Sequence, residues 1–216
     1  AMAEFAEVGI PAVDLAAAMA AARAAAPGQD LYYRGDTHWR KEGALAAGAA
    51  EPLARLHALC VLDGLGRLTP EEVTHALADH HPGVRENALR LAETRITPAL
   101  LSAAAELAAD PEPKVRLQLA FTAPVVAGLS EAYARIARRD HADKWISAAL
   151  LSAPPAAING VLFPAMTRDP VVARAAAPFV ASLIEIQAAS KPAAGYAALL
   201  DFIAQPGTSV LWLRAF

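Results

Sequence analysis

Residues 69–93 read "TPEEVTHALADHHPGVRENALRLAE" and contain the pattern from which the fold class can be inferred. The first four residues form a capping box with proline at the first helical position, which predicts a helix that begins after Thr69. In the central "ADHHPG", an aspartate can cap free backbone N–H groups, and a proline disfavours helical geometry at the residue before it. The stretch therefore predicts two helices joined by a tight turn.

This pattern recurs along the chain. Segments similar to the second helix begin at Ala54, Val84, Val115 and Trp145, which are 30, 31 and 30 positions apart. The turns before the last three are also similar, reading "ADHHPG", "ADPEPK" and "RDHADK", and "TRDPVV" from Thr167 begins a weaker unit. A fixed period of this length is typical of stacked structural repeats.

The first helices of the units also have a helical pattern. In "TPALLSAAAELAAD" from Thr97, four apolar residues share one helical face: Leu100, Ala104, Leu107 and Ala108. The expected first helices of the next two units are "LSEAYARIARRD" and "AAINGVLFPAMTRD". Hydrophobic residues make up 56% of the chain and aromatic residues 6%. Because alanine favours helices and strand-forming residues are sparse, the fold class expected is all-α.

Composition and charge exclude several classes of function. The formal net charge of −3 gives no electrostatic basis for nucleic-acid binding. Cys60 is the only cysteine, and its apolar surroundings predict a buried structural thiol. The most apolar long stretch, residues 175–189, contains Pro178 and Glu185, so no membrane span is expected.

The hairpin of about 30 residues, with its Asp–turn–Val–Arg pattern, closely resembles the short HEAT-like repeats over residues 53–180. Residues 56–93 are similar to the HEAT-like region of secreted haem-binding and dehydrogenase-like proteins. Those proteins carry a separate cytochrome module with a CxxCH motif, which this sequence lacks, so no haem or other cofactor is expected. The resemblance implies a right-handed α-solenoid.

The resemblance also implies a polar ladder between stacked repeats, formed by each turn aspartate and the arginine that follows it. It pairs Asp79 with Arg85 and Asp110 with Arg116. In the third unit Asp140 is retained but Ile146 replaces the arginine, so the ladder should weaken there. We interpret these residues as structural, because they can satisfy turn backbone groups and fix the register of the repeats. The alternative is a ligand-binding role.

Residues 1–50 do not fit the repeat. "EVGIPAVDL" and "LYYR" are short extended candidates, each followed by a helical pattern, so this segment is α/β-like with one or two short strands, or helical. "DLYYRGDTHWRKEGALAAG" resembles the C-terminal end of the SGNH-hydrolase-like domain of alginate O-acetyltransferases, over residues 8–50. The resemblance implies that Asp36 orients His38 and that His38 acts as base towards a serine far upstream.

A serine hydroxyl is a weak nucleophile until an adjacent imidazole accepts its proton. No Gly-Asp-Ser block precedes Asp36, and every serine lies in the repeats or the tail. These serines are Ser102, Ser130, Ser147, Ser152, Ser182, Ser190 and Ser209. We therefore expect no catalytic residue, and interpret Asp36 or Thr37 as the cap of the following helix.

Histidines give no metal motif. His75 and His80 are five positions apart, not at the i, i+4 spacing that directs two rings to one metal. His80 and His141 occupy equivalent turns, which favours solvated turn residues. No metal site is expected.

Three parts are therefore predicted: an N-terminal segment (1–50), HEAT-like repeats (51–180) and a C-terminal helical cap (181–216). The function expected is a non-catalytic scaffold or interaction module that binds a protein partner or an adjacent domain of a larger chain. The alternative is a fragment of an SGNH-like O-acetyltransferase or esterase that uses His38 and Asp36 with a nucleophile not present in this chain. A third interpretation is that the sequence is a chimera or a misassembled reading frame, in which two unrelated segments are joined near residue 51. Both resembled families are exported, which implies a periplasmic or secreted location.

Overall fold

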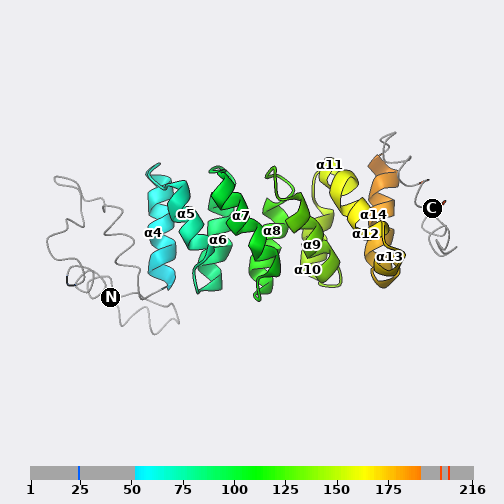
Figure 1. Ribbon diagram of the computed structural model, residues 1–216, viewed down its shortest axis with the longest axis horizontal. Coiled ribbons are helices and arrows are strands. Elements are labelled where there is room, and N and C mark those ends of the chain that lie inside the picture. Colours follow the sequence, from blue (N-terminus) through cyan, green and yellow to red (C-terminus); the bar gives the residue numbers. More distant parts are fainter. Residues whose placement is uncertain (1–23, 25–51, 191–199, 201–203, 205–216) are drawn as a thin grey trace, which may run out of the picture. The chain divides into compact units, whose positions relative to one another are not determined.

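The computed structural model describes residues 52–190 together with residues 24, 200 and 204. This part of the chain is helical and contains no strand, as expected for an all-α protein (Figure 1). The strands predicted within residues 1–50 lie outside the described residues. The chain divides into two compact units, Ala1–Arg95 and Ile96–Phe216.

The first unit contains α4 (Pro52–Gly64), α5 (Pro70–Leu77) and α6 (Pro82–Ala92). The predicted capping box at the start of α5 is confirmed. The Thr69 hydroxyl accepts a hydrogen bond from the Glu72 N–H at 3.3 Å, and the Glu72 carboxylate accepts one from the Thr69 N–H at 2.9 Å. Both α5 and α4 pack against α6.

The loop between α4 and α5 is held in place by Arg95. Its guanidinium donates to the Leu68 carbonyl at 3.2 Å and to the Leu91 carbonyl at 2.9 Å, and it forms an ion pair with Asp63. Gly66, within this loop, has a φ of 65°, a left-handed conformation that favours glycine. One arginine three residues beyond the end of α6 thus fixes the connection that leads into the hairpin.

The prediction of a buried Cys60 is wrong, because the thiol is exposed. Leu59 and Leu62 face the core of the first unit, and both are buried. Successive helical residues are rotated by about 100°, so Cys60 and the exposed Val61 point away from that core. The apolar run around Cys60 therefore has an outward face that its composition does not reveal.

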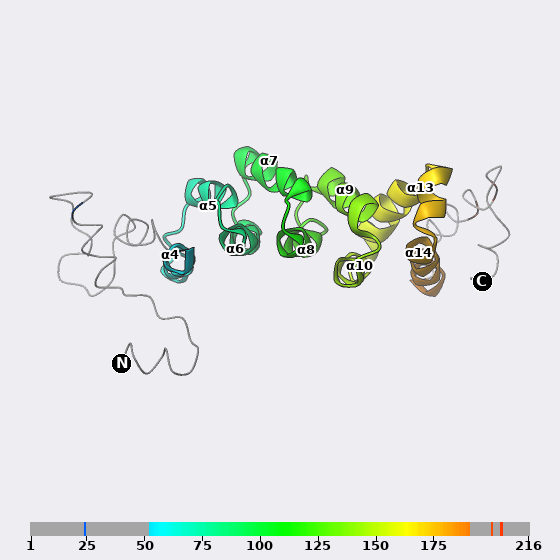
Figure 2. The same cartoon turned by 90° about the horizontal axis from the view of Figure 1, so that it is seen from below.

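The second unit begins with α7 (Pro98–Glu106), extended by the 3₁₀ turn η1 (Leu107–Ala109). Its next helices are α8 (Pro113–Thr122), α9 (Ser130–Asp140) and α10 (Lys144–Leu151). Within this unit α7 and α9 lie in one layer, and α8 and α10 in another (Figure 2). The apolar stripe predicted on the first of these helices is confirmed, since its members are all buried: Leu100, Ala104, Leu107 and Ala108.

The stretch "AAINGVLFPAMTRD", predicted as the first helix of the following unit, is helical but is not one regular α-helix. It consists of α11 (Pro155–Ala157), the π-helical turn η2 (Ile158–Leu162) and α12 (Phe163–Thr167). Proline at position 164 has no N–H to donate and crowds the carbonyl four residues earlier. The wider π turn lies directly before it, and the Phe163 N–H donates to the Ile158 carbonyl five residues back.

The described part ends with α13 (Pro170–Ala175) and α14 (Ala177–Ser190). The helix α14 continues through residue 180, where the predicted repeats end, and most of the predicted cap at 181–216 lies outside the described residues. Among the described helices, none is long and apolar enough to cross a membrane alone. The helical stretches Lys144–Leu151 and Pro155–Thr167 meet that requirement only together, with a bend of 107° between them.

Candidate functional site

The turn between α5 and α6 is bound by an arginine from α4. Arg55 Nε lies 2.7 Å from Asp79 Oδ2, and Arg55 Nη2 lies 2.8 Å from Asp79 Oδ1, so the guanidinium holds the carboxylate with two parallel bonds. Asp79 Oδ1 also accepts a hydrogen bond from the His81 N–H at 2.8 Å. Burial acts to raise the pKa of the Asp79 carboxyl, but the bonds from Arg55 and His81 outweigh it and hold the pKa below its usual range.

Arg85 holds the same turn from the other side. Its Nη1 donates to the Asp79 carbonyl at 2.8 Å and to the His80 carbonyl at 3.2 Å. Two arginines therefore divide the turn between them, Arg55 binding the carboxylate and Arg85 the backbone. A turn fixed in this way links three successive helices of the first unit.

The second unit repeats this arrangement. Arg116 Nη1 donates to the Asp110 carbonyl at 2.7 Å and to the Pro111 carbonyl at 3.2 Å, as Arg85 does in its own turn. Arg116 also binds Asp140 of the next turn, with Nε–Oδ2 at 2.7 Å and Nη2–Oδ1 at 2.8 Å. Their side chains are only 7% and 9% exposed. The bonds to Asp140 raise the pKa of the Arg116 guanidinium against the opposing effect of burial.

The structure refines the pairing that the sequence pattern suggested. Arg85 and Arg116 each reach the backbone carbonyl of the aspartate six residues earlier. In the ion pairs Arg55–Asp79 and Arg116–Asp140, the carboxylate partner lies 24 residues after the arginine. Arg55 was absent from the predicted ladder, although it occupies the same place in "ARLHALCVL" as the other two arginines in their segments.

In the turn before α10, the pattern of the sequence is shifted by one residue relative to the turns before α6 and α8. Ile146 is the third residue of α10, the position that Val84 and Val115 occupy in their helices, and all three side chains are buried. The position of the ladder arginine is therefore taken by Ser147, not by Ile146. Asp143 caps α10 by accepting hydrogen bonds from the N–H groups of Trp145 and Ile146 at 2.9 and 3.0 Å.

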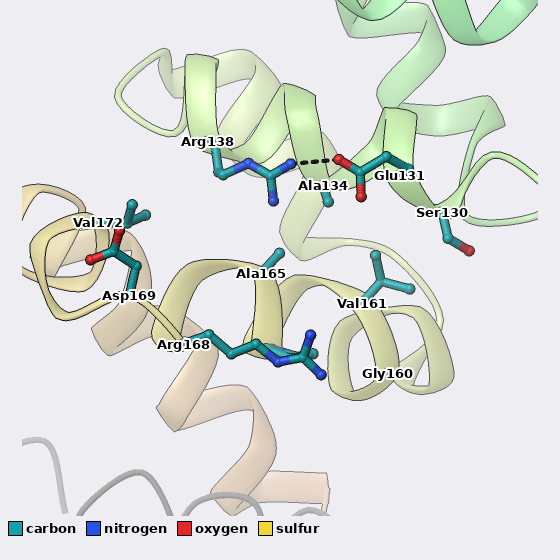
Figure 3. A pocket seen from close by; sticks show the side chains of 11 residues that line it. Ser130, Glu131, Ala134, Arg138, Gly160, Val161, Ala165, Arg168, Asp169 and Val172 are labelled. Atoms are coloured by element: carbon teal, nitrogen blue, oxygen red, sulfur yellow. Dashed lines mark hydrogen bonds and ion pairs between the residues drawn. The ribbon is translucent and has the colours of Figure 1, made fainter. Parts of the chain in front are cut away.

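A groove of about 520 Å³, which we call the α9–α12 groove, lies within the second unit. Its residues come from α9, from the helical stretch η2–α12 and from the start of α13 (Figure 3). On one wall Arg138 Nη2 lies 2.7 Å from Glu131 Oε1. On the other wall lie Arg168 and Asp169 (Figure 3). Sequence patterns gave no sign of this groove, because its residues belong to two different hairpins.

The remaining candidate residues give no site in the described part. Within it, no group of three or more His, Cys, Asp or Glu residues could hold a metal ion. Its other serines lie on helices, and Ser152, in the turn after α10, donates its hydroxyl to the Ala149 carbonyl at 2.8 Å. Asp36 and His38 lie outside the described residues.

Comparison with known families adds one finding. A family model described as the SGNH hydrolase-like domain of the acetyltransferase AlgX matches residues 1–119, just over half of the chain. The matched region contains Asp36 and His38 and extends through α7 into α8. No curated protein and no solved structure matches the chain significantly.

Proposed function

The chain belongs to the family of SGNH hydrolase-like domains of the AlgX acetyltransferase type, and we propose that its helical part forms a HEAT-like scaffold that binds a protein partner or an adjacent domain. In this proposal the helices over residues 52–190 stack as an α-solenoid. The scaffold itself is non-catalytic, and its function is to present a surface beside the SGNH-like segment.

The observation that supports the scaffold most strongly is the repeated arginine–aspartate pair. Arg55–Asp79 and Arg116–Asp140 use the same atoms, have the same distances and are separated by the same 24 residues. A bond that joins one second helix to the next turn fixes the register between successive hairpins. Such coupling between neighbours stabilises repeat proteins, whose units cannot bury their apolar faces alone.

Several large apolar side chains remain exposed on these helices. Trp145 is 65% exposed, and Lys144 Nζ lies 4.7 Å from the centre of its ring. Phe121 and Val171 are exposed as well, and so is Val125 in the turn after α8. Exposed aromatic residues are enriched at protein interfaces, which favours a protein partner over a role confined to internal packing.

The scaffold proposal is tested by photocrosslinking of the full chain. A photoreactive amino acid replaces Trp145 in one variant and Phe121 in another, and an extract of the cells that make the protein supplies partners. Any captured protein is then purified, and its binding to the unmodified chain is measured by calorimetry. We expect a saturable complex that the photoreactive variants also form. Absence of binding between the purified proteins would contradict the proposal.

A second candidate function is acyl transfer or ester hydrolysis, and the family match over residues 1–119 favours it. In this candidate, Asp36 fixes the tautomer of His38, and His38 accepts a proton from a serine that lies outside this chain. The serine oxygen then attacks an acetyl ester. A periplasmic or secreted location belongs to the proposal by analogy with the family.

The catalytic candidate is tested with p-nitrophenyl acetate and the full chain. Release of p-nitrophenol that disappears in both His38→Ala and Asp36→Ala, but persists in His80→Ala, would support it. His80 is a suitable control because its side chain is 75% exposed in the turn between α5 and α6. Hydrolysis that is unchanged by His38→Ala would contradict the candidate and leave the scaffold as the function of this chain. Absence of hydrolysis altogether would show only that this chain does not act without the serine that lies outside it.

A further inference from the structure

We infer that the α9–α12 groove binds an extended segment of a protein partner, with one Asp or Glu side chain, flanked by small apolar residues, held by Arg168. This inference rests on the proposed scaffold function and names the chemistry of its partner. The groove volume of about 520 Å³ lies within the usual range for ligand sites, about 300–1,000 Å³. Its rim includes exposed residues of α9 and of the turn before α13, so it is open to a chain that lies across it.

The groove is lined by small apolar residues between its charged walls. Ala134 comes from α9, and Gly160 and Ala165 come from the helical stretch opposite (Figure 3). A Cβ atom added at Gly160 would meet nothing within 4 Å. This free space allows a peptide backbone to approach the helix closely.

The charges of the groove leave one cation without a partner. Glu131 is engaged by Arg138, and the Asp169 carboxylate accepts a hydrogen bond from the Val171 N–H at 2.8 Å, which caps α13. Arg168 has no side-chain hydrogen bond or ion pair with any residue in the part of the chain that the structure describes. Its side chain extends along the helical stretch η2–α12 towards the end that carries Gly160 (Figure 3).

The same charges favour a carboxylate over a phosphate group. A guanidinium binds a carboxylate with two parallel hydrogen bonds, and Arg138 already has a carboxylate, that of Glu131, as its partner. Glu131 and Asp169 both line the groove, so they would repel a doubly charged phosphate more strongly than a singly charged carboxylate. A peptide with one acidic side chain between small apolar residues therefore matches the charged walls of the groove and the small apolar residues between them.

The experiment uses fluorescence anisotropy of labelled peptides with the full chain. The probes are extended peptides with a central Glu flanked by Ala and Val, their Gln counterparts and their phosphoserine counterparts. Charged hydrogen bonds contribute about 1.5–3 kcal/mol, so we expect Arg168→Gln to weaken binding of the Glu peptide by about tenfold or more. We expect a similar loss when Gln replaces Glu in the peptide.

Matched glycine variants test the position of the site. A Cβ at Gly160 or at Gly64 meets nothing within 4 Å, so both positions have room for a larger side chain. Gly160→Leu fills the groove and should abolish binding. Gly64→Leu lies outside the groove and should leave binding unchanged. Circular dichroism and thermal unfolding confirm that each variant is folded. Absence of binding to the wild-type chain, unchanged binding in Arg168→Gln and Gly160→Leu, or tighter binding of the phosphoserine peptide would each overturn the inference. If a captured and purified partner bound Gly160→Leu as tightly as the wild-type chain, the inference about the groove would be overturned and the scaffold function would stand.

Discussion

Arg116 in α8 and Asp140 at the end of α9 form a two-bond ion pair in which both side chains are almost entirely buried. The third guanidinium nitrogen of Arg116 is also used, since Nη1 donates to two carbonyl groups of its own turn. A buried charge of this kind is tolerated because its hydrogen-bonding groups are satisfied. The pair therefore joins two successive hairpins of the second unit and makes each dependent on the other.

The first prediction is that Arg116→Ala strongly destabilises the fold. Removal of the guanidinium leaves Asp140 as a buried charge without its main partner, and breaking a buried pair typically costs about 3–5 kcal/mol. Urea unfolding followed by circular dichroism measures this loss. The control is Arg138→Ala, which removes the exposed pair with Glu131 and should cost about 1 kcal/mol or less. Equal effects of the two substitutions would show that Arg116–Asp140 does not join the hairpins.

The second prediction concerns the pH dependence that Asp79 gives to stability. Its pKa in the folded chain lies below the unfolded value, so it contributes stability that is fully present above the unfolded pKa of about 3.9. That contribution is lost as the pH falls through the folded pKa. We therefore expect the difference in free energy of unfolding between the wild type and Asp79→Asn to be constant near neutral pH and to shrink in acid.

The measurement is a series of urea titrations between neutral pH and the acid transition. Arg55→Ala serves as the reference background, because it removes the main partner that lowers the pKa of Asp79. In that background the acid-dependent part of the Asp79→Asn effect should become smaller. A difference that stays constant down to the lowest pH would contradict the role assigned to the Arg55–Asp79 pair.

Local features of the helices could be predicted from sequence because their causes are local. The Thr69 capping box and the apolar stripe from Leu100 each depend on residues within one or two helical turns. The residue at which α10 begins, and therefore which of its side chains are buried, depends instead on its cap at Asp143. Alignment by period placed Trp145 opposite the buried Val84, whereas the structure exposes Trp145 and buries Ile146.

The candidate site could be predicted only in part. Recurring aspartates and arginines marked the turns, but the partner of each carboxylate depends on how successive hairpins pack, and Arg55 was therefore missed. The α9–α12 groove joins residues of two hairpins around a π turn. Sequence spacing alone does not show which side chains of those hairpins face each other.

The third prediction is that the threonine caps contribute to the stability of their helices. Thr69 and Thr97 accept hydrogen bonds from the N–H groups of Glu72 and Leu100 at 3.3 and 3.2 Å. Replacement of such a cap by alanine typically costs about 1 kcal/mol. Thermal unfolding of Thr69→Ala and Thr97→Ala measures the loss, with Ser102→Ala on the exposed side of α7 as the control. Midpoints equal to that of the control would contradict a capping role.

The last prediction is that Cys60 reacts with a thiol reagent while the chain is folded. Its side chain is exposed on the outward side of α4, and it is the only cysteine in the sequence. We expect a maleimide to label the native chain at a rate close to that of the urea-unfolded chain. Cys60→Ser should remove all labelling, which identifies the reacting thiol. Labelling that occurs only in urea would show that Cys60 is covered in the native chain, and it would contradict the outward orientation of this face of α4.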